Sequence, residues 1–135
     1  MRILAIDYGE KRMGFALGDT QIKTVLPLEP LIRKKPDSDL NHIKKILTDF
    51  GINKIIIGYP LNMNGSRSTI TKKVEDFIKI LLKNIKIDVE YVDERLSSFE
   101  AEEMIKPIIR NQKKRKKVLD SASAWIILRD FMEKQ

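Results

Sequence analysis

The chain has 135 residues, of which 42% are hydrophobic, and we expect one domain with a single core over residues 1–135. The absence of cysteine excludes disulfides, thiolate nucleophiles and sulfur-ligated zinc, and it suits a reducing compartment. No apolar run approaches the roughly 20 residues of a membrane span, and the first apolar run meets Asp7 too soon for a signal peptide. We therefore expect a cytoplasmic protein without a membrane partner.

The formal net charge of +7 indicates a polyanionic partner, because Lys and Arg release condensed counterions when they bind phosphates. Lysine is abundant along the whole chain, however, and a general compositional bias explains the charge equally well. The single histidine, His42, lies among polar residues in an amphipathic helical pattern, which indicates an exposed imidazole rather than a catalytic base or metal ligand. Any catalysis must therefore depend on carboxylates.

Three strands are predicted in the first part of the chain. Apolar runs over 3–6 and 13–17 are separated by a short polar segment, and this pattern predicts a β-hairpin. A third extended segment is predicted over 28–33, where Pro27 and Pro30 exclude a helix and indicate an edge strand.

An amphipathic helix and a buried strand follow. Asp37 and Ser38 offer N-caps, apolar residues recur at helical spacing over 40–50, and Gly51 ends the helix. The continuous apolar run over 54–58 predicts a strand that is buried on both faces at the centre of a sheet.

The alternation of helices and strands continues to the end of the chain. In order, the pattern predicts a polar loop over 62–68, a helix over 70–82, a strand over 88–92, a helix through Met104 and Ile105, and a last helix from Leu119. This order predicts an α/β fold with a mixed five-stranded sheet: three antiparallel strands, then β-α-β units, flanked by helices.

Carboxylates stand at three ends of the predicted elements. Asp7 ends the first strand, Glu94 follows the fifth, and Asp120 opens the last helix. Sites in α/β sheets form at the carboxyl ends of strands, so these acids can meet if the first strand neighbours the one at 54–58. Converging carboxylates need a cation, and all-oxygen ligands favour Mg²⁺ or Mn²⁺, which can activate water for phosphodiester hydrolysis.

Each acid also has a simpler structural explanation. Asp7 is typical of a residue at a strand-to-turn junction, and Asp120 would complement a helix dipole. Asp93 and Glu94 would be ordinary solvated acids before a helix. The meeting of acids from three element ends, in an otherwise basic protein, is what favours a metal site.

Four motifs occur in a fixed order along the chain: 7–16 (DYGEKRMGFA), 58–65 (GYPLNMNG), 93–95 (DER) and 120–124 (DSASA). Through them nearly the whole chain resembles the YqgF-type Holliday junction resolvases of the RNase H-like superfamily, also described as pre-16S ribosomal RNA nucleases. The resemblance implies an RNase H-like fold in which Asp7, Glu94 and Asp120 match the family's metal-binding and catalytic acids.

The chain departs from the family pattern at three serines. Ser97 and Ser98 stand where threonines are usual, and Ser123 replaces a usual alanine. None of these changes removes a carboxylate. Whether Asp93 or Glu94 is the ligand stays open, because neighbouring strand residues point to opposite faces, and we predict Glu94.

Several basic residues are candidates for contact with nucleic acid. Arg12 and Arg95 flank two of the acids and could clamp phosphates, although ion pairs with those acids explain them equally well. Arg67 could reach a phosphate from the loop after the buried strand. A dense basic run, expected to be a loop beside the site, is predicted to contact the substrate backbone without reading its sequence; it comprises Lys113, Lys114, Arg115, Lys116 and Lys117.

Two other motif features have competing explanations. Gly9 and Gly14 would let the backbone approach a phosphate closely, but a turn and a strand bulge explain them almost as well. Trp125 is expected to pack in the core rather than to stack on a base.

The residues predict metal-dependent hydrolysis of structured nucleic acid, and the family resemblance implies a role in processing of the 5′ end of pre-16S rRNA, in Holliday junction resolution, or in both. The alternative is a binding module without catalysis, associated with nucleic acid or the ribosome. A lobe of an actin-like ATPase is a third hypothesis, suggested by the Asp-Tyr-Gly turn, but the chain is too short for two lobes. The sequence leaves open DNA against RNA and the oligomeric state, although a two-fold junction would favour a homodimer.

Overall fold

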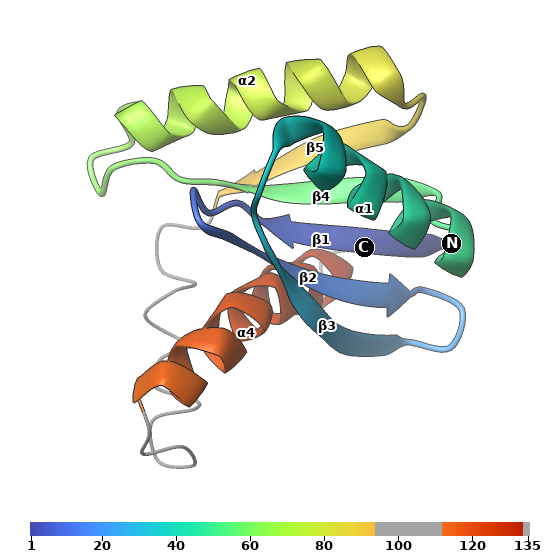
Figure 1. The fold of residues 1–135 in the computed structure, drawn as a ribbon. Coiled ribbons are helices and arrows are strands. Elements are labelled where there is room, and N and C mark those ends of the chain that lie inside the picture. The colour runs from blue at the N-terminus through green and yellow to red at the C-terminus, as the bar shows by residue number, and fades with distance from the viewer. Residues whose placement is uncertain (94–111, 134–135) are drawn as a thin grey trace.

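A computed structural model describes the backbone of residues 1–93 and 112–133, and the side chains of residues 1–93 and 122–133. Figure 1 shows one sheet with helices α1 (Pro36–Phe50) and α2 (Thr69–Asn84) on one face and helix α4 (Gln112–Glu133) across the other. Among the described residues, no helix has both the length and the apolar character needed to cross a membrane.

The sheet has five strands in the order β3-β2-β1-β4-β5. Strand β1 is antiparallel to β2, β2 is antiparallel to β3, and β4 and β5 run parallel to β1. The strands span Arg2–Asp7 (β1), Arg12–Asp19 (β2), Thr24–Ile32 (β3), Lys54–Tyr59 (β4) and Asp88–Asp93 (β5). The predicted mixed sheet is confirmed, including the edge position of β3, and β1 and β4 are neighbours, which is the condition for Asp7 and Glu94 to meet. The strand over 54–58 was predicted at the centre of the sheet, but it lies one place from the middle. The middle strand is β1, with β4 buried beside it.

Helices α1 (Pro36–Phe50) and α2 (Thr69–Asn84) confirm the two predicted amphipathic helices. Gly51 ends α1 in the left-handed conformation, as expected. The predicted N-caps, Asp37 and Ser38, are wrong. The N-cap is Lys35 and the helix starts at Pro36, because proline has the backbone geometry of a first helical residue.

Strand alternation divides the core into two layers. In β1, Leu4 and Ile6 pack towards α1 and α2, whereas Ile3 and Ala5 pack towards α4. Helix α4 (Gln112–Glu133) lies close to the sheet at Gly18, where an added Cβ would be 2.8 Å from the Met132 sulfur. The absence of a side chain at Gly18 therefore sets how closely α4 approaches β2.

Helix α4 runs antiparallel to β1. Its C-terminal part lies over the amino end of the sheet: Phe131 is 5.4 Å from the Lys54 amine at the start of β4, and Met132 lies over Gly18, which pairs with Ile3. Its earlier turns therefore lie towards the carboxyl end of β1, as Figure 1 shows.

Helix α4 begins seven residues before the predicted start at Leu119, and the expectation of a basic loop was wrong. Residues 113–117 are helical, because Lys and Arg are good helix formers and no Gly or Pro interrupts the segment. Asp120 is therefore inside α4 and does not open it. The helix predicted through Met104 and Ile105 lies outside the described residues.

Two side chains have the environments expected from the sequence. His42 is exposed on α1. Trp125 packs against the core layer under α4, and its Nε1 donates a hydrogen bond to the Val25 carbonyl at 3.3 Å, so it is a core residue.

Candidate active site

Asp7 is the last residue of the middle strand. It is half-buried and continues the alternation of Ile3 and Ala5, so its side chain is on the α4 face of the sheet. Its cross-strand partner on β2 is Gly14, and the β1–β4 register continued by one residue places Gly58 on its other side. Because neither neighbour has a Cβ, the sheet leaves room beside this carboxylate.

A tight turn over residues 8–11 follows Asp7 and leads into β2. An added Cβ on Gly9 would lie 2.1 Å from the Arg12 carbonyl oxygen, which is far inside any normal contact. The turn therefore closes only with glycine at this position. Of the two explanations for Gly9, the turn is the one that the geometry supports.

Arg12 begins β2 on the same face as Asp7. It precedes Met13, which packs towards α1 and α2, so alternation puts the Arg12 side chain on the α4 side. Its Nη1 atom is buried and has no hydrogen-bond partner in the part of the chain that the structure describes. Burying a guanidinium N–H without an acceptor costs free energy, so an anion that accepted from it would relieve that cost.

Arg67 lies in the loop between β4 and α2. Its guanidinium makes an ion pair with Glu75 of α2, and Glu75 also accepts a hydrogen bond from the Tyr59 hydroxyl at 3.3 Å. The hydrogen bond from Arg67 lowers the pKa of the Glu75 carboxyl. These contacts place Arg67 on the α2 side of the sheet, opposite the face of Asp7.

Hydrogen bonds within the loop give residues 60–68 a fixed shape. Asn62 and Ser66 bond through both backbone and side chains, and Gly65 takes a positive φ of 86° at the tip. At the end of the loop, the Thr71 hydroxyl of α2 donates to the Pro60 carbonyl at 2.7 Å. The loop is therefore anchored at the same edge of the sheet as the turn after Asp7.

Comparison with known proteins identifies the family. The model of the RuvX family, described as a Holliday junction resolvase, matches residues 1–134. The chain belongs to the RuvX family. A relative from Halothermothrix orenii named "Putative pre-16S rRNA nuclease" is 40% identical to this RuvX chain over 135 residues, which cover 100% of this chain and 96% of that protein.

Solved structures show the same fold as this RuvX chain. The fowlpox virus Holliday junction resolvase matches with a TM-score of 0.62 at 17% identity and covers 100% of both chains. RuvC from T. thermophilus, in complex with a Holliday junction substrate, matches with a TM-score of 0.53 at 10% identity over 91% of each chain. The predicted RNase H-like α/β fold is confirmed. Membership of a resolvase family also confirms the predicted enzyme class, a nuclease that hydrolyses phosphodiester bonds.

The predicted acidic trio of this RuvX chain is described only in part. Asp7 has a described side chain, Asp120 is placed by its backbone within α4, and Glu94 lies outside the described residues, as does Arg95. The side chains of the basic run 113–117 are likewise outside the described part. Among the residues with described side chains, no group of three His, Cys, Asp or Glu residues is close enough to hold a metal ion.

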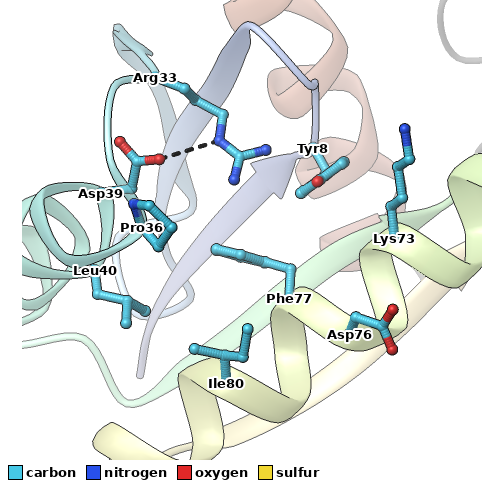
Figure 2. Close-up of a pocket in the computed structure, with 9 residues that line it drawn as sticks. All are labelled: Tyr8, Arg33, Pro36, Asp39, Leu40, Lys73, Asp76, Phe77 and Ile80. Carbon is cyan, nitrogen blue, oxygen red and sulfur yellow. Dashed lines mark hydrogen bonds and ion pairs between the residues drawn. The ribbon is translucent and has the colours of Figure 1, made fainter.

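Sequence reasoning missed Arg33, which contacts the turn after Asp7, and Asp39, which contacts Arg33. Arg33, the residue after β3, donates to the Gly9 carbonyl at 3.0 Å. Asp39, in the first turn of α1, accepts from Arg33 at 3.2 Å, as Figure 2 shows. The available signal was the position of Asp39, one helical turn before Ile43 on the apolar face of α1. An acid in that position needs a buried cation.

Proposed function

We propose that this RuvX chain hydrolyses phosphodiester bonds of structured nucleic acid with Mg²⁺ or Mn²⁺ held by Asp7, Glu94 and Asp120, and that its substrate is the 5′ region of pre-16S rRNA. The observation that carries the proposal is the place of Asp7. A half-buried carboxylate ends the middle strand between two glycines, at the edge of the sheet where α/β enzymes bind their ligands.

The course of α4 supports a role for Asp120. The buried residues Ala124, Ile127 and Phe131 lie at helical spacing on the face of α4 that contacts the sheet. Position 120 is one turn before Ala124 along the same line, and the earlier turns of α4 lie towards the carboxyl end of β1. The helix backbone therefore leads Asp120 towards Asp7.

Strand alternation supports Glu94 over Asp93 as the ligand from β5. Val92 packs in the core layer under α4, the layer on the same face as Asp7. Asp93 is in register with Tyr59, whose ring lies 4.9 Å from the Tyr91 ring and whose hydroxyl bonds to Glu75 of α2. Asp93 thus belongs to the α2 face, away from Asp7, and for this reason we propose Glu94 rather than Asp93 as the ligand.

The donor set suits a hard divalent cation, because carboxylate oxygens are the ligands that Mg²⁺ and Mn²⁺ prefer. Such an ion would lower the pKa of a bound water and neutralise charge on the reacting phosphate. The chain positions the ligands: Asp7 is fixed by its strand pairing with β2 and by the closed turn at Gly9. Arg12, with a buried N–H that lacks an acceptor, would donate to a non-bridging phosphate oxygen on the same face.

The basic helical segment 113–117 would extend this surface along α4. We propose that Lys113, Lys114, Arg115, Lys116 and Lys117 hold the backbone of the nucleic acid beyond the reacting phosphate, with Arg95 near the acids. Contacts of this kind position the substrate without reading its sequence. Two copies of the chain acting on a two-fold substrate would require a homodimer.

Cleavage assays with matched variants test the proposal. Wild type, Asp7→Asn and Asp120→Asn are compared on end-labelled pre-16S rRNA and on four-way DNA junctions, with Mg²⁺ or Mn²⁺. Asp88→Asn is the control, because Asp88 is an exposed acid at the amino end of β5, at the opposite edge of the sheet. We expect the control to cleave like wild type and both test variants to lose at least about 100-fold in rate.

The comparison of the two substrates in this assay decides between RNA and DNA. Cleavage of the rRNA precursor but not of the junction supports the proposed substrate, and the reverse result assigns the chain to junction resolution. Binding without cleavage by wild type with either metal would refute the proposed mechanism. A second series replaces Lys113–Lys117 with alanine, with Lys44→Ala/Lys45→Ala on the opposite face as control. The first should weaken substrate binding and reduce its salt dependence, and the second should not.

A further inference from the structure

We propose that Arg33 is a positioning residue for the RuvX reaction: it holds the turn that follows Asp7, and Asp39 holds Arg33. The inference rests on the proposed function, because the shape of this turn matters for cleavage only if Asp7 is a metal ligand. Neither residue belongs to the acidic trio. Arg33 reaches the turn from the segment just after β3, and Asp39 contacts Arg33 from α1.

Arg33 contacts most of the turn over residues 8–11. Its Nη1 donates to the Gly9 carbonyl at 3.0 Å, and its backbone N–H donates to the Lys11 carbonyl at 2.9 Å. Its guanidinium carbon lies 4.9 Å from the centre of the Tyr8 ring, a cation–π distance. One side chain thus fixes both the residue after Asp7 and the glycine that closes the turn.

Asp39, on α1, fixes the position of the Arg33 guanidinium. Its side chain is almost completely buried, its Oδ2 accepts from Arg33 Nε at 3.2 Å, and its Oδ1 accepts from the Lys34 backbone N–H at 3.2 Å. Figure 2 shows the pair at the wall of a pocket between α1 and α2. Because a buried carboxylate is costly without its partner, the pair restricts the guanidinium to one geometry.

The pair acts from the side of the sheet opposite to Asp7. The pocket has a volume of about 200 Å³ and is lined by Tyr8, Arg33 and Phe77 among others. Tyr8 packs on Phe77 of α2 at 5.5 Å between ring centres, on the α1 and α2 face, whereas Asp7 is on the α4 face. Arg33 therefore positions the turn from the rear and does not touch the reacting phosphate.

The contacts of Arg33 keep its guanidinium protonated. Burial alone would lower the pKa of its guanidinium, but its contacts with Tyr8 and Asp39 outweigh this effect and raise the pKa. A second contact to the turn, from Lys73 of α2 to Glu10 at 2.7 Å, is exposed at both ends. Exposed ion pairs contribute little to rigidity, so Lys73 serves as a control at the same turn.

The variants separate positioning from simple stabilisation. Arg33→Lys keeps the charge. A single ammonium, however, cannot reproduce the planar guanidinium, which donates to the Gly9 carbonyl and to the Asp39 carboxylate at the same time. Arg33→Met combined with Asp39→Asn removes both charges at once and leaves no unpaired buried ion. Lys73→Met is the control. Thermal melts establish the folded fraction of each protein, and all rates are expressed per folded enzyme.

The first measurement is Mn²⁺ binding by calorimetry in the absence of nucleic acid, and the second is cleavage as a function of Mn²⁺ and substrate. For Arg33→Lys and for the double variant we expect Mn²⁺ affinity to fall about tenfold and kcat about 10- to 100-fold, with KM for nucleic acid nearly unchanged, since small misplacements of catalytic groups are costly. Lys73→Met should match wild type in both measurements.

Two results would overturn the inference. One is wild-type Mn²⁺ affinity and kcat in both Arg33 variants, and the other is an activity loss that merely follows the unfolded fraction. Failure of the proposed function has a different signature: Asp7→Asn would then bind Mn²⁺ as well as wild type does, whatever the Arg33 variants show.

Discussion

Gly9→Ala is the most direct test of the turn after Asp7. The new Cβ would lie 2.1 Å from the Arg12 carbonyl oxygen, and the obstacle is backbone, which cannot rotate away like a side chain. Reaching a tolerable contact requires a shift of about 1 Å in the turn. We expect a stability loss of about 1–3 kcal/mol from this overpacking.

The same shift should affect the chemistry more than the stability. A misplacement of about 1 Å can cost about 100-fold in rate, and Asp7 is only two residues from the substituted position. The assay is single-turnover cleavage of the substrate at saturating Mn²⁺, corrected for the folded fraction by thermal denaturation.

The control for this substitution is Gly51→Ala. Gly51 has a positive φ of 61°, so alanine there costs about 1 kcal/mol, but no atom lies within 4 Å of the added Cβ. This variant should lose stability and keep wild-type cleavage per folded molecule. If Gly9→Ala keeps wild-type cleavage as well, the argument that the turn geometry controls Asp7 is wrong.

Three further predictions follow from other contacts. Gly18→Ala should lower the melting temperature, because the Cβ would press on α4 side chains at 2.8–2.9 Å; an unchanged melting temperature would mean that α4 can move outward freely. Arg12→Met should weaken substrate binding without loss of thermal stability, since its buried Nη1 has no acceptor within the described chain; a strongly destabilised variant in thermal melts would contradict this. The pKa of Glu75 is lowered chiefly by the hydrogen bond from Arg67, so the pair stabilises the fold above the ordinary carboxyl pKa of 4.5, and this contribution disappears as the pH falls through the folded-state value. The melting-temperature difference between wild type and Glu75→Gln should therefore shrink in acid, and a constant difference would refute the assignment.

Much of the fold could be predicted from the sequence because the signals are local. The continuous apolar run at 54–58 marked a strand covered on both faces, and the prolines at 27 and 30 marked the sheet edge. The starts of helices were less predictable. Pro36 set the start of α1 one residue ahead of the expected caps, and a run of basic residues that resembled a loop extended α4 back to Gln112.

The candidate site was predictable only for residues that their own sequence neighbourhood identifies. Asp7 could be identified from its place at a strand end and from the motif around it. The contact from Arg33 to Gly9 spans 24 positions. It depends on the pairing of β3 with β2, which brings the end of β3 beside the turn between β1 and β2, and no local sequence pattern encodes this pairing. Asp39 gave a partial signal as an acid on an apolar helix face, but its partner could not be named without the tertiary structure.

The antiparallel course of α4 also affects when the enzyme becomes active during synthesis. Residues 1–93 supply the five strands of the sheet and helices α1 and α2 on one face. On the other face, Ile3, Ala5, Ala16 and Ile56 form an apolar surface that, among the described residues, α4 covers. Chains fold from the N-terminus as they are made, so this apolar surface stays uncovered until α4 has been synthesised. On the proposed function, Asp120 arrives with that helix. A nascent chain would then complete its core and its set of metal ligands in the same docking step.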